Sequence, residues 1–220
     1  MTQLNFEQAR FNMIEQQIRP WEVLDQRILD LLLQVPREEF VPTTYRNLAF
    51  ADISVPLAHD QVMMAPKVEG RLLQSLMLTL TDRILEIGTG SAFMTALLAK
   101  SAQQVDSVDI FPDFVQEAAV KLKAIDVTNV TLAVGDAANG WQLDTRYDVV
   151  ILTGSVPVLK SHFQEQLNLG GRLFAIVGED PAMQAQLITR ISEQEWYVEV
   201  LFETSVPPLI GAPQPERFIF

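Results

Sequence analysis

The sequence predicts an α/β fold with a mostly parallel β-sheet, and three observations support this fold class. The chain has 220 residues, enough for one domain with a sizeable hydrophobic core. From residue 83 onward, short apolar runs alternate with segments whose apolar residues recur at helical spacing. This alternation is typical of a parallel sheet covered by helices on both faces. The glycine pair Gly88 and Gly90 follows the first apolar run, at the position of a turn from strand to helix.

The first 80 residues are expected to form an extension of helices and loops, packed on an α/β core at 81–220 within a single domain. Apolar residues in 22–33 recur at helical spacing. Pro36 ends this helix, because proline disfavours helical conformation in the residue before it. After a proline-rich stretch, Pro66 takes the first position of another helix, where proline is tolerated. The apolar face of that helix is expected to comprise Leu72, Leu73, Leu76, Met77 and Leu80.

The core is expected to alternate strands and helices and to end in an antiparallel hairpin at the sheet edge. Strands are predicted at 83–87, 105–108, 130–134, 149–152 and 173–177. Helices are predicted at 92–100, 113–123, 157–167 and 181–192. The final hairpin would pair strands at 196–204 and 217–220, joined by a loop rich in proline and glycine.

The composition of the chain excludes several classes of protein. Asp and Glu number 28 against 16 Lys and Arg, and the net charge of −12 argues against broad nucleic-acid binding, which depends on neutralising phosphates. The absence of cysteine excludes disulfides, thiolate nucleophiles and cysteine-bound metals, and His59 and His162 are too few for a histidine-rich metal site. Apolar runs fall far short of the roughly 20 residues of a membrane span. We therefore expect a cytoplasmic protein without a metal site, membrane segment or nucleic-acid partner.

Three predicted strand ends together indicate a nucleoside site. Gly88 and Gly90 let the backbone turn tightly and approach a ligand closely. Asp109 closes the second strand, where its two acceptor oxygens suit two ribose hydroxyls. Gly135 and Asp136 end the third strand, and the carboxylate could accept a hydrogen bond from an adenine amino group. Ligands of open α/β sheets bind beyond the carboxyl ends of strands, so these turns are expected to meet at one site.

Phe93 narrows the choice of nucleotide. A dinucleotide fingerprint has a third glycine three residues after Gly90, where this chain has Phe93. A pyrophosphate on the helix is therefore disfavoured, and S-adenosylmethionine fits best, with S-adenosylhomocysteine as its product and Glu86 orienting the turn. Each position also has a purely structural interpretation: a strand–helix turn for the glycines, a helix N-cap for Asp109, and an ordinary turn residue for Asp136.

Several segments resemble the protein-L-isoaspartate O-methyltransferase family over nearly the whole chain. They are ARFNMIEQQI, VPREEFVP, NLAFAD followed by PL, LEIGTGSAFMTALLA, NVTLAVGDAANG, YDVVILTGSVP and QLNLGGRLFAIVG. The resemblance implies a Rossmann-like, seven-stranded class I methyltransferase sheet with a reversed edge strand, preceded by N-terminal helices. It also implies cytoplasmic residence, S-adenosylmethionine as methyl donor, and a protein-repair role in which a carboxylate of damaged aspartyl residues, in a peptide or protein, is methylated.

The match assigns cofactor and acceptor positions in this chain. The expected cofactor-binding residues are Gln61, Met63, Glu86, Gly88, Thr89, Gly90, Asp109, Ile110, Gly135, Asp136 and Ala137. The acceptor segment of the family, Gly-Gln-Thr-Ile-Ser-x-Pro, corresponds here to DQVMMAP at 60–66. Val62 and Met64 therefore replace the threonine and the serine, and with Lys67 they occupy the expected catalytic positions.

The loss of these two hydroxyls bears on the acceptor. A carboxylate is already ionised at neutral pH and needs no general base, so its methylation depends on positioning and a dry pocket. Each lost hydrogen bond to a charged group is worth about 1.5–3 kcal/mol, so two could cost on the order of 10²–10⁴ in productive binding or rate. Replacement donors could come from Lys67, His59, Thr153 or Ser155. Alternatively, the three apolar residues at 62–64 line a pocket for an apolar acceptor.

Two other classes of function fit part of the sequence. A protein that binds S-adenosylmethionine but has altered catalysis would have a regulatory role or another substrate. A dinucleotide oxidoreductase is disfavoured by Phe93 and by the lack of recognisable hydride-site residues. The loop at 206–215 either connects edge strands or rims the acceptor cleft, and His162 is expected on the surface of its helix.

Overall fold

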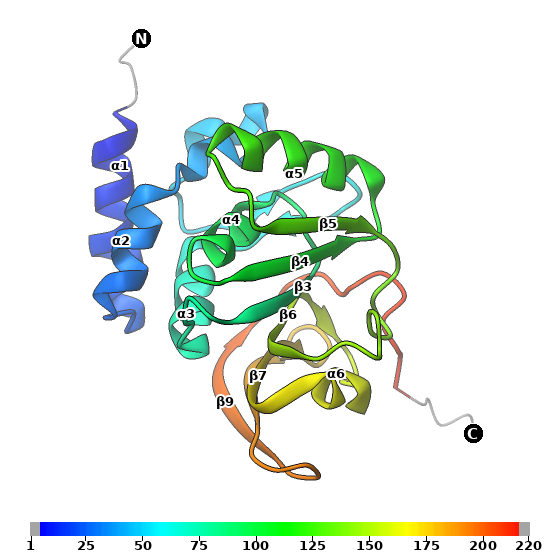
Figure 1. The fold of residues 1–220 in the computed structure, drawn as a ribbon. Helices are drawn as coiled ribbons and strands as arrows, with labels where there is room; N and C mark the ends of the chain where they lie inside the picture. Colours follow the sequence, from blue (N-terminus) through cyan, green and yellow to red (C-terminus); the bar gives the residue numbers. More distant parts are fainter. Residues whose placement is uncertain (1–4, 216–220) are drawn as a thin grey trace, which may run out of the picture.

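The computed structural model describes residues 5–215, and its central feature is a seven-stranded sheet in the order β5-β4-β3-β6-β7-β8-β9 (Figure 1). Strands β3 to β7 pair in parallel, whereas β8 is antiparallel to both β7 and β9. The strands are β3 (Arg83–Ile87), β4 (Gln104–Asp109), β5 (Val130–Val134), β6 (Tyr147–Val156), β7 (Leu167–Val177), β8 (Met183–Arg190) and β9 (Trp196–Thr204). The prediction of a mostly parallel sheet with an antiparallel edge is confirmed.

Short helices and a small hairpin precede the sheet, and further helices connect its strands. The N-terminal elements are α1 (Phe6–Met13), the π-helical turn η1 (Ile14–Ile18), the 3-10 turns η2 (Arg19–Trp21), η3 (Arg37–Glu39) and η4 (Thr43–Leu48), α2 (Gln26–Gln34), the hairpin strands β1 (Val55–Pro56) and β2 (Val62–Met63), and α3 (Pro66–Leu76). The connecting helices are α4 (Phe93–Ala99), α5 (Pro112–Ala124) and α6 (Ser161–Glu165). Among residues 5–215, no helix combines the length and apolar character needed to cross a membrane.

Both faces of the sheet are buried, as β6 illustrates. Successive strand residues point to opposite faces, so Val149 and Ile151 join one hydrophobic cluster while Val150 and Leu152 join another. The first cluster includes residues of α2, α3 and α4, which connects the N-terminal helices to the sheet. The second includes Phe163 of α6. Coverage on both faces explains why β6 is continuously apolar at its centre.

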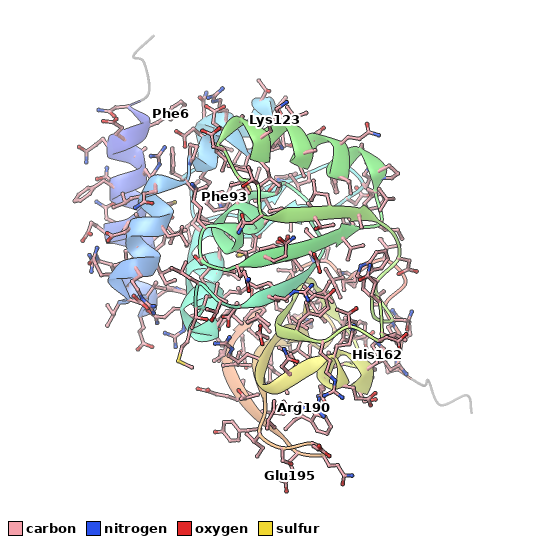
Figure 2. The ribbon with its side chains drawn as sticks, in the orientation of Figure 1. Phe6, Phe93, Lys123, His162, Arg190 and Glu195 are labelled. Atoms are coloured by element: carbon pink, nitrogen blue, oxygen red, sulfur yellow. The ribbon has the colours of Figure 1, made fainter. Side chains whose placement is uncertain are left out.

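The region predicted as a helix at 181–192 is instead the strand β8, and this prediction was wrong. Buried Met183, Ala185 and Leu187 alternate with the more exposed Gln184 and Gln186, which is the period of a strand. Alanine, glutamine and leucine favour helices, but pairing with β7 on one side and β9 on the other overrides that preference. Figure 2 shows Arg190 and Glu195 at the β8–β9 end of the molecule, opposite Lys123 of α5.

Other boundaries also differ from the predictions. The helix expected at 157–167 is limited to α6, because β6 continues to Val156 and β7 begins at Leu167. The helix expected at 22–33 starts later, where Asp25 caps α2 by accepting a hydrogen bond from the Arg27 N–H. The helix expected from Pro66 ends at Leu76, which leaves Met77 and Leu80 exposed rather than on its buried face. The strand expected at 217–220 lies outside the described residues.

Candidate active site

A pocket lies beyond the carboxyl ends of β3, β4 and β5, where the sequence predicts a nucleoside site. It encloses about 850 Å³ of empty space, part of it open to solvent, which is within the usual size range of ligand sites. All the residues expected to bind the cofactor line it except Glu86, and Val62 and Met64 line it as well. The turns after three neighbouring strands therefore meet at one site, together with the segment that corresponds to the acceptor motif.

The turn after β3 leaves no room for side chains at its first glycine. Gly88 has a φ of +100°, a conformation that favours glycine, and a Cβ atom there would overlap the Thr153 hydroxyl. That hydroxyl donates hydrogen bonds to the carbonyls of Ile87 at 2.9 Å and Gly88 at 2.6 Å. Its proton is thus already engaged with the backbone, so Thr153 lines the pocket without offering it a donor.

Asp109 and Asp136 stand at the next two strand ends. The Asp109 carboxylate accepts hydrogen bonds from the Gly90 N–H at 2.8 Å and the Phe111 N–H at 3.0 Å, one on each oxygen. Each oxygen keeps a second acceptor position, so the carboxylate can still receive ligand hydroxyls. Burial raises the pKa of Asp109 above its usual range, against the effect of these backbone donors. Asp136 accepts a hydrogen bond from the Ala138 N–H at 3.0 Å.

Glu86 lies beneath the turn rather than in the pocket. Its Oε2 accepts hydrogen bonds from the Thr95 hydroxyl at 2.5 Å and the Ser107 hydroxyl at 2.6 Å, while Oε1 is buried without a partner. Because Ser107 donates to Glu86, the Thr89 hydroxyl is the donor in its 2.7 Å contact with Ser107. Burial raises the pKa of Glu86 to about 8. Its contact with the pocket is thus indirect, through Ser107 and Thr89.

The hairpin of β1 and β2, residues 55–64, forms a flap along one side of the pocket. Leu57 and residues 61–64 of this flap all line the pocket. The two strands pair Val55 with Met63 and Pro56 with Val62. Residues 62–64 thus contribute one valine and two methionines to the pocket lining, and the side chains of these residue types carry no strong hydrogen-bond donor.

Glu69 lines the pocket and was missed by the sequence analysis. It is 2% exposed and forms a buried ion pair with Arg37, which is fully buried. Burial raises the pKa of Glu69 to about 7, although the Arg37 guanidinium opposes this shift. A signal was present, because Glu69 interrupts the apolar face of α3 that contains Leu72 and Leu73. A carboxylate at such a position requires a partner, which here comes from a residue 32 positions earlier in the chain.

The proposed replacement donors lie elsewhere. Lys67 does not line the pocket; its ammonium forms an ion pair with Asp52 at 2.8 Å and lies 4.6 Å from the centre of the Trp21 ring. The Ser155 hydroxyl donates its proton to the Val206 carbonyl at 2.9 Å, so this proton is not free for an acceptor. His59 does not line the pocket; its side chain contacts Phe111, Phe114 and Asp113 at the start of α5. His162, expected at a helix surface, is half-buried with its Nε2 enclosed and without a hydrogen-bond partner.

Several pocket residues carried no recognisable signal in the sequence. Phe111 and Phe114, at the start of α5, and Met94 of α4 enclose the site. The loop after β9 runs parallel to the end of β6, where the Ser155 N–H donates to the Pro207 carbonyl at 3.0 Å and the Leu209 N–H donates to the Ser155 carbonyl at 2.9 Å. An added Cβ at Gly154 would lie 2.8 Å from Leu209. This loop, expected either to connect edge strands or to rim the acceptor cleft, contributes to the pocket lining; the strand it would connect to, at 217–220, lies outside the described residues. Its lining residues are Val206, Pro207, Leu209 and Ile210.

Comparison with known proteins identifies the family. The model of the family Protein-L-isoaspartate(D-aspartate) O-methyltransferase (PCMT) matches residues 8–212. The chain belongs to the PCMT family. Two curated relatives in this family are each 34% identical to this chain. The match to protein-L-isoaspartate O-methyltransferase 1 of Rhodopseudomonas palustris strain HaA2 covers 96% of this chain and 89% of the relative. The match to the protein-L-isoaspartate O-methyltransferase of Methanoculleus marisnigri covers 92% of this chain and 91% of the relative.

Solved structures share the PCMT fold. A structure from Plasmodium falciparum, assigned as a protein-L-isoaspartate O-methyltransferase and determined in complex with S-adenosylhomocysteine, superposes with a TM-score of 0.79 at 18% identity. The superposition covers 94% of this chain and 99% of that chain. A second protein-L-isoaspartate O-methyltransferase superposes with a TM-score of 0.74 at 21% identity, over 92% of this chain and 65% of that one. The family model and the 34% identical relatives confirm the family resemblance predicted from the sequence, and these two structures confirm its fold.

Proposed function

We propose that the protein methylates a carboxylate of damaged aspartyl residues in peptides or proteins, with S-adenosylmethionine as the methyl donor. The observation that carries this proposal is the convergence of Gly88, Asp109 and Asp136 on one pocket in a chain of the PCMT family. Relatives in that family are named for the same reaction, and a structural neighbour binds S-adenosylhomocysteine.

The charges around the pocket fit this cofactor. Among the described residues that line it, the ionisable ones are Glu69, Asp109 and Asp136, all of them acidic. S-adenosylmethionine carries a sulfonium, an ammonium and a carboxylate group, so its net charge is positive, and nearby carboxylates stabilise positive charge. Arg37 offsets the charge of Glu69, so the uncompensated carboxylates are Asp109 and Asp136. We assign the ribose hydroxyls to Asp109 and the adenine amino group to Asp136.

When bound, S-adenosylmethionine supplies an electrophilic methyl group on its sulfonium. A carboxylate oxygen of the acceptor forms the new bond to this methyl carbon while the carbon–sulfur bond breaks, which gives a methyl ester and S-adenosylhomocysteine. The pocket residues position the two reactants and exclude water, because an ionised carboxylate needs no general base. Flap residues Val62 and Met64 make this environment dry, at the cost of the hydrogen bonds that hydroxyl side chains would give to the acceptor.

A methyl-transfer assay with matched peptides tests the proposal. The full-length protein is incubated with methyl-labelled S-adenosylmethionine and either a peptide that contains an isoaspartyl residue or the same peptide with a normal aspartyl residue. We expect base-labile label on the isoaspartyl peptide alone. Binding of S-adenosylhomocysteine without transfer to any carboxylate peptide would instead favour a regulatory protein and would contradict the proposed reaction.

A further inference from the structure

The root of the flap is held by buried contacts. Arg37 donates a hydrogen bond to the carbonyl of Met64 at 2.7 Å and another to the carbonyl of Ala49 at 2.8 Å. The same guanidinium pairs with Glu69 and lies 4.8 Å from the centre of the Phe93 ring. Water cannot compete for these bonds, because Arg37 has no exposed surface. The end of the flap that joins α3 is therefore fixed.

The tip of the flap is held by exposed contacts with the start of α5. The His59 ring stacks on the Phe111 ring, with centroids 4.0 Å apart and planes inclined by 5°, and meets the edge of Phe114 at 5.5 Å. His59 Nε2 donates a hydrogen bond to Asp113 Oδ2 at 2.8 Å. The side chains of His59 and Asp113 are 39% and 51% exposed, so water competes for this bond.

The backbone at the tip forms a tight hairpin turn. His59 and Asp60 are consecutive non-glycine residues with φ values of +57° and +55°. Two-residue hairpin turns favour positive φ at both central positions, and His and Asp enter this region more readily than most residues with a Cβ atom. The turn is closed by its own hydrogen bonds, from the Gln61 N–H to the Ala58 carbonyl at 3.1 Å and from the Leu57 N–H to the Gln61 carbonyl at 2.8 Å. The contacts of His59 with α5 therefore set where this turn lies relative to the pocket.

The position of these contacts connects them to the pocket. Phe111 and Phe114, on which His59 packs, line the pocket from one side, and flap residues Leu57 and 61–64 line it from another. His59 and Asp113 do not line the pocket, so their contact connects the flap to α5 outside the pocket. The hydrogen bond from His59 also lowers the pKa of Asp113, which keeps this carboxyl group ionised as an acceptor.

We propose that His59 is a positioning residue that clasps the flap tip to α5 and thereby limits the escape of bound cofactor. Opening separates the tip from Phe111 and Asp113 while Arg37 keeps the root in place. This inference rests on the proposed function, because it takes the pocket between flap and α5 to be the cofactor site.

Dissociation of S-adenosylhomocysteine from four variants tests the clasp. His59→Ala removes both contacts, His59→Phe keeps the stacking alone, and Asp113→Asn weakens the hydrogen bond alone. Arg27→Ala is the matched control, because it breaks an exposed ion pair of the same 2.8 Å length with Asp25 on α2. We expect stopped-flow dissociation to be about 10-fold faster in His59→Ala, less affected in His59→Phe and Asp113→Asn, and unchanged in Arg27→Ala. The KM for S-adenosylmethionine should rise in His59→Ala while the KM for the acceptor does not.

Hydrogen exchange of the cofactor-free protein tests the clasp without ligand. Amides at 57–62 should exchange faster in His59→Ala than in the wild type, whereas those of α3 should not change. Equal dissociation rates of S-adenosylhomocysteine in the wild type and His59→Ala, or equal amide exchange at 57–62 in these two proteins, would contradict the proposed role of His59. If the wild type bound no S-adenosylhomocysteine, the proposed function would fail. If His59→Ala does not fold, His59→Phe and Asp113→Asn give the same two readouts.

Discussion

Val62 and Met64 occupy positions where a carboxylate acceptor would need hydrogen-bond donors. A double substitution tests whether the missing hydroxyls limit methylation of such an acceptor. Val62→Thr with Met64→Ser introduces two hydroxyls on the flap, each able to give a charge-assisted bond worth about 1.5–3 kcal/mol. We expect kcat/KM for an isoaspartyl peptide to increase by on the order of 10² or more. Val62→Ala with Met64→Ala is the control, since it shortens the same side chains without adding donors. An equal change in both double variants would refute the role of the hydroxyls.

Asp109 is the residue on which the cofactor assignment depends most. Asp109→Ala should weaken the binding of S-adenosylhomocysteine by about 1–3 kcal/mol, because hydrogen bonds from the ribose to a charged acceptor are lost. Isothermal titration calorimetry measures this difference. Asp144→Ala, at an exposed position outside the pocket lining, serves as the control. Unchanged affinity in Asp109→Ala would contradict the assignment of the ribose.

At the scale of elements, Arg37 joins η3, the flap root, α3 and α4. Arg37→Met should lower the free energy of unfolding by about 3–5 kcal/mol, because it leaves the Glu69 carboxylate buried without its partner. The combined variant Arg37→Met with Glu69→Leu should be clearly more stable than Arg37→Met alone, since no buried charge remains. Urea unfolding of the three proteins measures the difference. A combined variant no more stable than Arg37→Met alone would show that the unpaired Glu69 charge is not the reason for the loss.

The elements also show what the sequence could predict. The strand ends with Gly88, Asp109 and Asp136 were correctly expected to meet, because the carboxyl ends of neighbouring parallel strands lie at one edge of a sheet. Strand β8 was not predicted as a strand, because its amino-acid composition favours a helix. Its strand conformation depends on pairing with β7 and β9, which lie elsewhere in the sequence. The contact of His59 with Asp113 spans 54 residues and leaves no local pattern.

At the scale of the whole molecule, the buried Glu86 couples stability to pH. Its pKa is raised from an ordinary value of 4.5 to about 8, so the native state holds the proton more tightly than the unfolded state does. The contribution of Glu86 to stability is therefore greatest below pH 4.5 and is lost as the pH rises toward 8. Each pKa unit corresponds to about 1.4 kcal/mol.

Glu86→Gln should remove this dependence, because glutamine stays neutral at every pH. We expect the free energy of unfolding of the wild type, relative to Glu86→Gln, to fall between pH 5 and pH 8 by on the order of 1 kcal/mol or more. Urea titrations at several pH values provide the measurement. A difference between the two proteins that stays constant with pH would show that Glu86 is already ionised in the native state at the lower end of this range.

The most direct test of the account is a crystal structure of the protein with S-adenosylhomocysteine. We predict that the nucleoside occupies the pocket beyond β3, β4 and β5, with its ribose hydroxyls on Asp109, its adenine amino group beside Asp136, and its sulfur facing flap residues Val62 and Met64. A nucleoside bound elsewhere, or seated in this pocket without contact to Asp109, would contradict the account.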